Sequence, residues 1–148
     1  MSKQSVLILC TENSARSQMA EGIIRHLAGD RFDVYSAGLN PQGIHPLTRV
    51  VMNEIGIDTT EQSSRDVSVY LGKVSFNYVI FVCDKAERDC PHVFPFIANR
   101  LSWPIEDPKA GISSDKEKLE LFRQVRDTLY QRITSWLAET DRISVRQK

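Results

Sequence analysis

The amino-acid sequence predicts an α/β protein with a central, four-stranded parallel sheet and helices on both faces of that sheet, a three-layer α/β/α arrangement. Two apolar runs rich in β-branched residues, at positions 5–9 and 78–82, are typical of strands buried on both faces. Helical patterns alternate with the strand patterns, and this alternation favours parallel strands joined by crossover helices. A length of 148 residues fits a single domain over residues 1–148.

Each helix is predicted from apolar residues three and four positions apart, and each strand from a short apolar run between turn residues. Gly29 and Gly56 supply stops for the first two helices. Asn99 and Arg100 weaken the pattern of the last strand, and Asp115 stands near the start of a long C-terminal helix. The predicted elements are, in order, a strand at 5–9, a helix at 20–28, a strand at 32–36, a helix at 47–55, a short helix at 66–71, strands at 78–82 and 97–103, and the C-terminal helix.

The composition is that of an ordinary globular chain, with 41% hydrophobic and 26% charged residues, and it excludes a disordered or fibrous protein. Nineteen basic residues balance nineteen acidic ones, so no overall charge attracts nucleic acid or a membrane, and an anion site must be local. The apolar run at 6–9 is too short for a membrane span or a signal-peptide core. The three cysteines are odd in number, which excludes a fully paired secreted framework. We therefore expect a cytoplasmic monomer without nucleic-acid or membrane partners.

Three chemically capable residues follow predicted strands. Cys10 comes directly after the first strand, Cys83 directly after the strand at 78–82, and Asp107 a few residues after the last strand. In open parallel sheets, ligands bind beyond the carboxyl ends of the strands, near a topological switch point. We therefore expect these three residues at one edge of the sheet.

The loop between the first strand and the first helix has the features of an anion site. Successive backbone N–H groups in such a loop form a concave nest, and the following helix adds its positive N-terminal end. Asn13 tolerates the left-handed backbone that a nest needs, and the Glu12 carboxylate is expected to point away from the anion. Arg16 matches two oxygens of a tetrahedral oxyanion. The predicted oxyanion-binding residues are Thr11, Glu12, Asn13, Ser14, Ala15, Arg16 and Ser17.

The position of Cys10 in this loop predicts a nucleophile. The positive field of the loop is expected to lower the thiol pKa to about 3.5–7.5, and the Ser17 hydroxyl can donate to the thiolate. A thiolate beneath an oxyanion is aimed at its central atom. The alternative is that Cys10 is a buried apolar residue at the end of a core strand, with Arg16 solvated on the helix start.

The sequence resembles a known family from this loop onward. The similarity is to arsenate reductases built on the low-molecular-weight protein tyrosine phosphatase fold, which implies a flavodoxin-like architecture. It continues to about the start of the C-terminal helix. The segments that carry it are Cys10-Thr11-Glu12-Asn13-Ser14-Ala15-Arg16-Ser17-Gln18-Met19-Ala20-Glu21-Gly22, Ser36-Ala37-Gly38, Gly56-Ile57-Asp58, Cys83 with Cys90-Pro91, and Trp103-Pro104-Ile105-Glu106-Asp107-Pro108.

The resemblance implies a thiol relay. Cys10 attacks arsenate, Cys83 attacks Cys10 to release arsenite, and Cys90 attacks Cys83, leaving a Cys83–Cys90 disulfide for an external reductant. That reductant is thioredoxin in the family, with glutaredoxin or glutathione left open by the sequence, and no cofactor or metal is bound. Asp107, in the family's aspartate–proline loop, is the expected acid. The anion loop itself cannot distinguish arsenate from phosphate, so the further thiols indicate the reductase.

Four alternatives stay open at this point. In the first, the chain is a phosphatase that hydrolyses phosphate monoesters through a Cys10 phosphoenzyme. In the second, it is a non-catalytic module that binds phosphoanions or senses thiols. Cys83, Cys90 and His92 are also a possible zinc set, although their spacing is wider than usual. Asp107 on its own reads as a turn residue before proline.

The segment 84–89 is rich in helix formers, and the sequence predicts a short helix that ends before Pro91. In a helix, Cys83 and Cys90 are about 10 Å apart along the axis, whereas a disulfide needs Cα atoms within about 7 Å. We therefore expect this helix to unwind when the disulfide forms.

The chain departs from the family at several positions. Ala15 stands where many relatives have another cysteine, and Lys109 follows Pro108, where tyrosine phosphatases often place tyrosines that grip aromatic substrates. Some relatives bind potassium through residues that match Asn13, Glu21, Ser36 and an aspartate, and Arg65 replaces that aspartate here. The resemblance suggests that the Arg65 guanidinium substitutes for the ion near Glu21 and Asn13, which makes activity independent of potassium; a solvated loop charge is the alternative.

Overall fold

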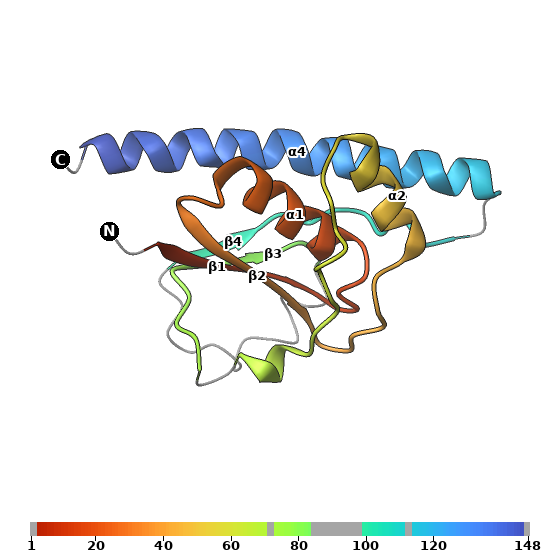
Figure 1. Ribbon diagram of the computed structural model, residues 1–148, viewed down its shortest axis with the longest axis horizontal. Helices are drawn as coiled ribbons and strands as arrows, with labels where there is room; N and C mark the ends of the chain where they lie inside the picture. The colour runs from red at the N-terminus through yellow and green to blue at the C-terminus, as the bar shows by residue number, and fades with distance from the viewer. Residues whose placement is uncertain (1–2, 71–72, 84–98, 112–113, 147–148) are drawn as a thin grey trace.

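The computed structural model describes residues 3–70, 73–83, 99–111 and 114–146, with side chains up to residue 141 (Figure 1). Strand β1 ends at Cys10, and helix α1 begins six residues later. The elements are β1 (Gln4–Cys10), α1 (Arg16–Ala28), β2 (Phe32–Gly38), α2 (Pro46–Glu54), the 3-10 helix η1 (Val67–Val69), β3 (Tyr78–Phe81), β4 (Asn99–Ser102) and α4 (Asp115–Arg146).

The four strands form one parallel sheet in the order β2-β1-β3-β4, which confirms the predicted sheet. From β1 the chain passes first to β2 on one side and later to β3 on the other. The carboxyl ends of β1 and β3 are therefore the topological switch point of the sheet, where this class of fold binds ligands.

Helices α1, α2 and α4 lie together on one face of the sheet (Figure 1). The Ser36 hydroxyl of β2 points to this face, because it donates to the Glu21 carboxylate of α1 at 2.5 Å. Tyr35 therefore points to the opposite face, where its ring meets those of Tyr70 and Phe76 at centroid distances of 5.2 and 5.6 Å. In the part of the chain that the structure describes, η1 and the segment after it cover this second face.

The buried side chains form one core between the sheet and the helices. The run Val6–Leu9 is fully buried, as expected for an inner strand of a covered parallel sheet. Phe122, Leu129 and Ile133 of α4 are also fully buried, and each contributes about 1.5–3 kcal/mol by leaving water. Within the described ranges, no helix combines the length and the apolar character needed to cross a bilayer.

Two predicted elements differ in the structure. The short helix expected at 66–71 is a 3-10 turn of three residues, because the Asp66 carboxylate caps the Ser68 N–H at 2.9 Å and starts a tight turn. The last strand covers only Asn99–Ser102 among the residues described; it is an edge strand, and Asn99 and Arg100 are exposed on it. The helix predicted at 84–89 lies outside the described residues.

Helix α2 begins at a histidine cap. The Nδ1 atom of His45 accepts a hydrogen bond from the Leu47 backbone N–H at 3.1 Å. Burial first, and then the charges of Lys109 and Lys118, hold the pKa of His45 below its ordinary value, while Asp107 acts in the opposite direction. The neutral imidazole, which is the form able to cap the helix, is therefore the form that the fold favours.

We expect His45→Asn to reduce the loss of stability on acidification. Because the pKa of His45 is lower in the folded than in the unfolded chain, its cap is fully present above about pH 6.5 and is lost as the pH falls through the folded pKa. Asparagine caps a helix without titrating, and a cap contributes about 1 kcal/mol. Melting temperatures measured at pH 7 and pH 5 should therefore differ by about 3 °C less in the variant. An equal drop in both proteins would contradict this role of His45.

Candidate active site

The carboxyl edge of the sheet brings together the residues that the sequence placed there. The Val82 N–H donates to the Leu9 carbonyl, so the chain after β3 stays beside β1 as far as Cys83. The thiols of Cys10 and Cys83 interact closely enough for Cys83 to be the largest influence on the pKa of Cys10, and both cysteines are buried. Across the same edge, Asp107 lies 3.8 Å from the Arg16 guanidinium. Cys90, the third predicted thiol, lies outside the described residues.

The loop after Cys10 is shaped by hydrogen bonds on its outer side. Since the N–H and C=O of a peptide unit point in opposite directions, tying the carbonyl groups outward turns the amide N–H groups toward the inside of the loop. The result is the concave nest of donors that anions occupy. The backbone N–H groups of Leu39, Asn40, Gln42 and His45 donate to the carbonyl oxygens of Cys10, Thr11, Glu12 and Ser14 at 3.3, 2.7, 3.0 and 3.0 Å.

Asn13 holds the centre of the loop from behind. Its φ of 51° lies in the left-handed region, as predicted. The side-chain amide donates to the hydroxyls of Ser17 and Ser36 at 2.7 and 3.0 Å, and its oxygen accepts from the Arg65 backbone N–H at 2.8 Å. Asn13 is fully buried, so these bonds fix its strained backbone conformation.

The Glu21 carboxylate pairs with a cation on its own helix. Arg25, one turn further along α1, donates to the Glu21 carboxylate at 2.7 Å and to the Val34 carbonyl at 2.7 Å. The Arg65 guanidinium instead donates to the Ser63 hydroxyl at 3.1 Å. Arg25, at the favourable i,i+4 distance on the same helix, is therefore the ion-pair partner of Glu21, while Arg65 lines the same cavity as Glu21 and donates its backbone N–H to Asn13. Independence from potassium stays a prediction.

Gly38, at the end of β2, is a site residue that the sequence analysis did not single out for a role. A Cβ atom there would lie 2.7 Å from the Thr11 carbonyl oxygen and 2.9 Å from the Asn13 backbone nitrogen. Only glycine lets β2 approach the anion loop this closely. The Ser-Ala-Gly sequence that ends the strand was the available signal.

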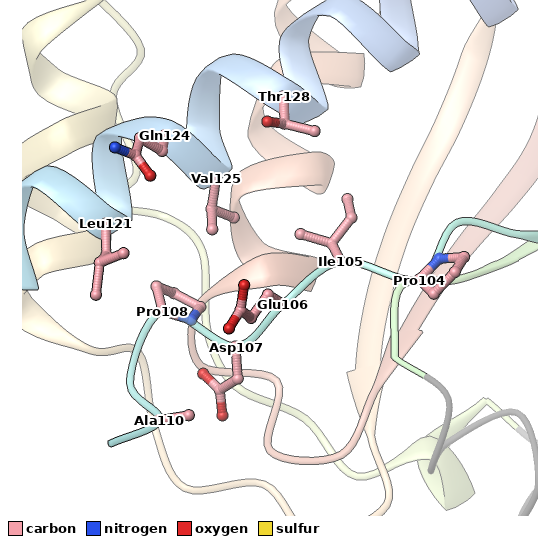
Figure 2. Close-up of a pocket in the computed structure, with 10 residues that line it drawn as sticks. All are labelled: Pro104, Ile105, Glu106, Asp107, Pro108, Ala110, Leu121, Gln124, Val125 and Thr128. Carbon is pink, nitrogen blue, oxygen red and sulfur yellow. The ribbon is translucent and has the colours of Figure 1, made fainter. Parts of the chain in front are cut away.

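Arg16 and Asp107 form the far wall of the site. The Arg16 side chain is 12% exposed, and it donates to the Ile105 carbonyl at 2.8 Å. The Asp107 carboxylate accepts the Lys109 backbone N–H at 2.9 Å, which is the turn that Pro108 predicts. Figure 2 shows this loop running past α4. A cavity of about 270 Å³ lies between them, and Leu121 and Val125 help to line it.

The remaining loop residues have supporting contacts. The Glu12 carboxylate points out of the loop, as predicted, and it pairs with the Lys109 ammonium. Buried Ala15 turns its carbonyl to the Met19 N–H at 2.9 Å, at the start of α1. The Ser17 hydroxyl is the acceptor of the bond from Asn13.

The expected low pKa of Cys10 is wrong for this arrangement. The hydrogen bond with Cys83 comes first and burial second, and together they raise the pKa of the Cys10 thiol above its ordinary value. The Arg16 charge and the Asn13 N–H lower it and are outweighed. The pKa expected from the sequence took account of the positive field of the loop. It did not include the contact with a second thiol, which forms only in the folded chain.

We expect Cys83→Ala to shift the pH dependence of Cys10 alkylation to lower pH. The substitution removes the largest cause that raises the pKa, whereas Arg16 and the Asn13 N–H remain. Because the thiolate is the reactive form, the midpoint of the rate of alkylation by iodoacetamide against pH reports this pKa. A shift of about one pH unit or more is expected, equivalent to 1.36 kcal/mol. An unchanged or higher midpoint in the variant would show that the contact with Cys83 is not what holds the proton on Cys10.

Only Cys83 of the zinc set considered in the sequence analysis lies among the described residues. In the portion of the chain covered by the structure, no group of three or more histidine, cysteine, aspartate or glutamate side chains is placed to hold an ion. Cys90 and His92, two members of the zinc set considered above, lie outside that portion.

A buried thiol at the base of a backbone anion loop that ends in an arginine defines the class: enzymes that use a cysteine on tetrahedral oxyanions. The comparison with family models agrees. The chain belongs to the low molecular weight phosphotyrosine protein phosphatase family, whose model matches residues 5–146.

The most similar relatives include arsenate reductases. One from Halalkalibacterium halodurans is 41% identical over 140 residues, which cover 95% of this chain and 99% of the relative. One from Oceanobacillus iheyensis is 40% identical over 134 residues, covering 90% of this chain and 94% of the relative. A solved arsenate reductase in the phosphate binding state superposes with a TM-score of 0.76 at 30% identity, covering 92% and 98% of the two chains. A phosphatase from T. tengcongensis, 21% identical with a TM-score of 0.74 and coverage of 93% and 99%, shares the fold.

Proposed function

We propose that this protein reduces arsenate to arsenite through a relay of its own thiols. The observation that carries the proposal is the contact between two buried thiols, Cys10 and Cys83, at the anion loop. A phosphatase of this kind needs one nucleophilic thiol, whereas a reductase needs a second thiol within bonding reach of the first. The names of the relatives that are about 40% identical support the same activity.

The anion loop supplies binding and orientation. The amide N–H groups of residues 11–16 and the Arg16 guanidinium hold three oxygens of the arsenate, with the arsenic above the Cys10 sulfur. Because the pKa of Cys10 is raised, its proton leaves only when a base arrives. The arsenate dianion is such a base, and one of its oxygens accepts the Cys10 proton as the sulfur attacks.

The first step forms a Cys10–arsenic bond. The thiolate attacks arsenic, and the oxygen on the opposite side departs as water after accepting a proton from the Asp107 carboxyl. Asp107 lies 3.8 Å from Arg16, which keeps its carboxyl at the mouth of the loop. The product is a thiol-bound arsenate in which arsenic is still pentavalent.

The second step transfers two electrons. The Cys83 thiolate attacks the Cys10 sulfur, a sulfur–sulfur bond forms, and the electron pair of the sulfur–arsenic bond stays on arsenic, which leaves as trivalent arsenite. The Thr11 hydroxyl lies 3.3 Å from the Cys83 sulfur and can donate to its thiolate. In the third step Cys90 attacks Cys83, which frees Cys10 and leaves a Cys83–Cys90 disulfide.

An external thiol reductant returns the enzyme to its starting state. Thioredoxin is the proposed donor, with glutaredoxin and glutathione as the second candidate, and no bound cofactor takes part. Such donors keep thiols reduced in the cytoplasm, which is the proposed location of the protein, as a monomer. The second candidate function is hydrolysis of phosphate monoesters through a Cys10 phosphoenzyme; the family and the shared anion loop favour it.

The deciding experiment counts arsenite with and without an external donor. In a single turnover without reductant, the relay predicts about one equivalent of arsenite from the wild type and from Cys90→Ser, and none from Cys83→Ser, because release needs only the second thiol. With thioredoxin, thioredoxin reductase and NADPH, continued arsenate-dependent turnover is expected from the wild type alone.

The competing function gives a different pattern. A phosphatase would oxidise no NADPH in response to arsenate, and its hydrolysis of p-nitrophenyl phosphate would survive both cysteine substitutions. That pattern would overturn the proposed reductase. Replacing thioredoxin by glutathione and glutaredoxin in the same assay identifies the donor.

A further inference from the structure

The loop that carries Asp107 is tied to the anion loop at two points. Arg16 donates to the Ile105 carbonyl at 2.8 Å. On the other side of Asp107, the Lys109 ammonium pairs with the Glu12 carboxylate and donates to the Ser14 hydroxyl at 2.6 Å. The cavity between the Asp107 loop and α4 lies on the other side of this loop (Figure 2). The two contacts therefore hold the Asp107 loop against the anion loop.

Lys109 is unusually enclosed for a loop lysine. Its side chain is only 20% exposed, whereas that of Glu12 is 43% exposed. Beside it runs a groove of about 330 Å³, lined by Glu12, Ser14, Lys109 and residues 42–46. Lys109 therefore spans from the Asp107 loop to the anion loop along the wall of a groove that adjoins the anion site.

The position of Lys109 matters because of the direction in which the leaving group departs. Cys10 attacks from the base of the loop, and the leaving group departs on the opposite side, in line with the attack. The organic part of an ester would therefore emerge at the mouth, between Asp107 and the groove, where Lys109 crosses. A free oxyanion has no organic part, so it fits in the anion loop beneath the Lys109 side chain.

We propose that Lys109 is a specificity-determining residue that makes the site select free inorganic oxyanions over phosphate monoesters. It acts in two ways. Its stem closes the route that an organic substituent would take, and its ammonium neutralises Glu12, whose negative charge on the outer side of the loop would otherwise repel an approaching dianion. The inference deepens the proposed function, but it concerns oxyanion selection alone and needs no thiol relay.

The test compares two anions that differ by one substituent. Titration calorimetry with orthophosphate and with phenylphosphonate gives a ratio of dissociation constants for the wild type, Lys109→Ala and Lys116→Ala. Lys116 is an exposed lysine of α4 and serves as the matched control. We expect Lys109→Ala to weaken orthophosphate about tenfold and to tighten phenylphosphonate, as loss of a charged contact and opening of the groove require. Lys116→Ala should leave the ratio unchanged.

A second pair of variants separates the two effects. Glu12→Gln combined with Lys109→Ala should recover orthophosphate binding while the preference against phenylphosphonate stays lost, because only the charge is compensated. Lys109→Met, which keeps most of the stem, should weaken orthophosphate and still exclude phenylphosphonate. Melting temperatures confirm that each variant is folded.

Ratios that agree within about threefold between the wild type, Lys109→Ala and Lys109→Met, for folded proteins, would overturn the inference, because that is within the spread of ordinary surface substitutions. Its failure is distinguishable from failure of the proposed function. The single-turnover release of arsenite decides the relay, whereas these binding ratios are measured with ligands that no thiol can reduce.

Discussion

Cys10→Ser should lose arsenate-dependent turnover and ester hydrolysis together, to less than about one thousandth of the wild-type rate, and should keep orthophosphate binding. A serine hydroxyl is scarcely ionised near neutral pH and forms no disulfide, so neither proposed chemistry can begin. The donors of the anion loop are backbone N–H groups and Arg16, which the substitution leaves in place. Orthophosphate binding that survives the loss of turnover would show that Cys10 is needed for the chemistry and that the loop donors hold the anion without it.

Orthophosphate affinity by calorimetry, NADPH oxidation with thioredoxin, and p-nitrophenyl phosphate hydrolysis make the comparison. Because Cys10 is 3% exposed, a melting temperature shows whether the smaller side chain disturbs packing. If Cys10→Ser kept more than about a tenth of either activity, Cys10 would not be the nucleophile, since loss of a nucleophile costs several orders of magnitude.

Gly38→Ala should weaken oxyanion binding strongly without replacing any residue of the proposed chemistry. The added methyl carbon would lie 2.7, 2.9 and 3.0 Å from the Thr11 carbonyl oxygen, the Asn13 nitrogen and the Asn13 Cβ. Two of these are backbone atoms of the anion loop, so the loop itself must move. We expect an overpacking cost of about 1–3 kcal/mol in the free energy of unfolding and about a hundredfold weaker orthophosphate binding, because the loop donors lose their alignment.

Gly56→Ala is the matched control for that prediction. Gly56 has a φ of 78°, so alanine is strained there, but nothing lies within 4 Å of the new carbon. It should destabilise the fold by about 1 kcal/mol and leave orthophosphate affinity as it was. Equal affinities in the Gly38→Ala and Gly56→Ala variants would show that the approach of β2 does not shape the anion loop.

Much of the fold could be predicted because its signals are local. The run 6–9 is apolar at every position, and in the structure it lies in an inner strand of a covered parallel sheet. Once two parallel strands are placed, the residues after them must share an edge. That rule alone predicted that Cys10 and Cys83, far apart in the sequence, would lie at one edge of the sheet.

Other parts of the site depend on distant contacts that no local pattern encodes. Lys109 was recognised only as a departure from the phosphatases, and its pairing with Glu12 requires the Asp107 loop to cross the anion loop. The choice between Arg25 and Arg65 as the partner of Glu21 depends on side-chain reach within the folded chain. The pKa of Cys10 depends on a second thiol that comes into contact with it only in the folded chain.

The outward carbonyl bonds of the anion loop have one more consequence. Backbone N–H groups of residues 39–45 already donate to those carbonyl groups in the folded protein. The conformational entropy of shaping the anion loop is therefore lost during folding and is not lost again when an anion binds, so the loop is preorganised. A rigid shell of this kind responds to tetrahedral shape and negative charge, which arsenate and phosphate have in common. In the proposed reaction, discrimination between arsenic and phosphorus therefore falls to the sulfur atoms, because only arsenic accepts the electron pair.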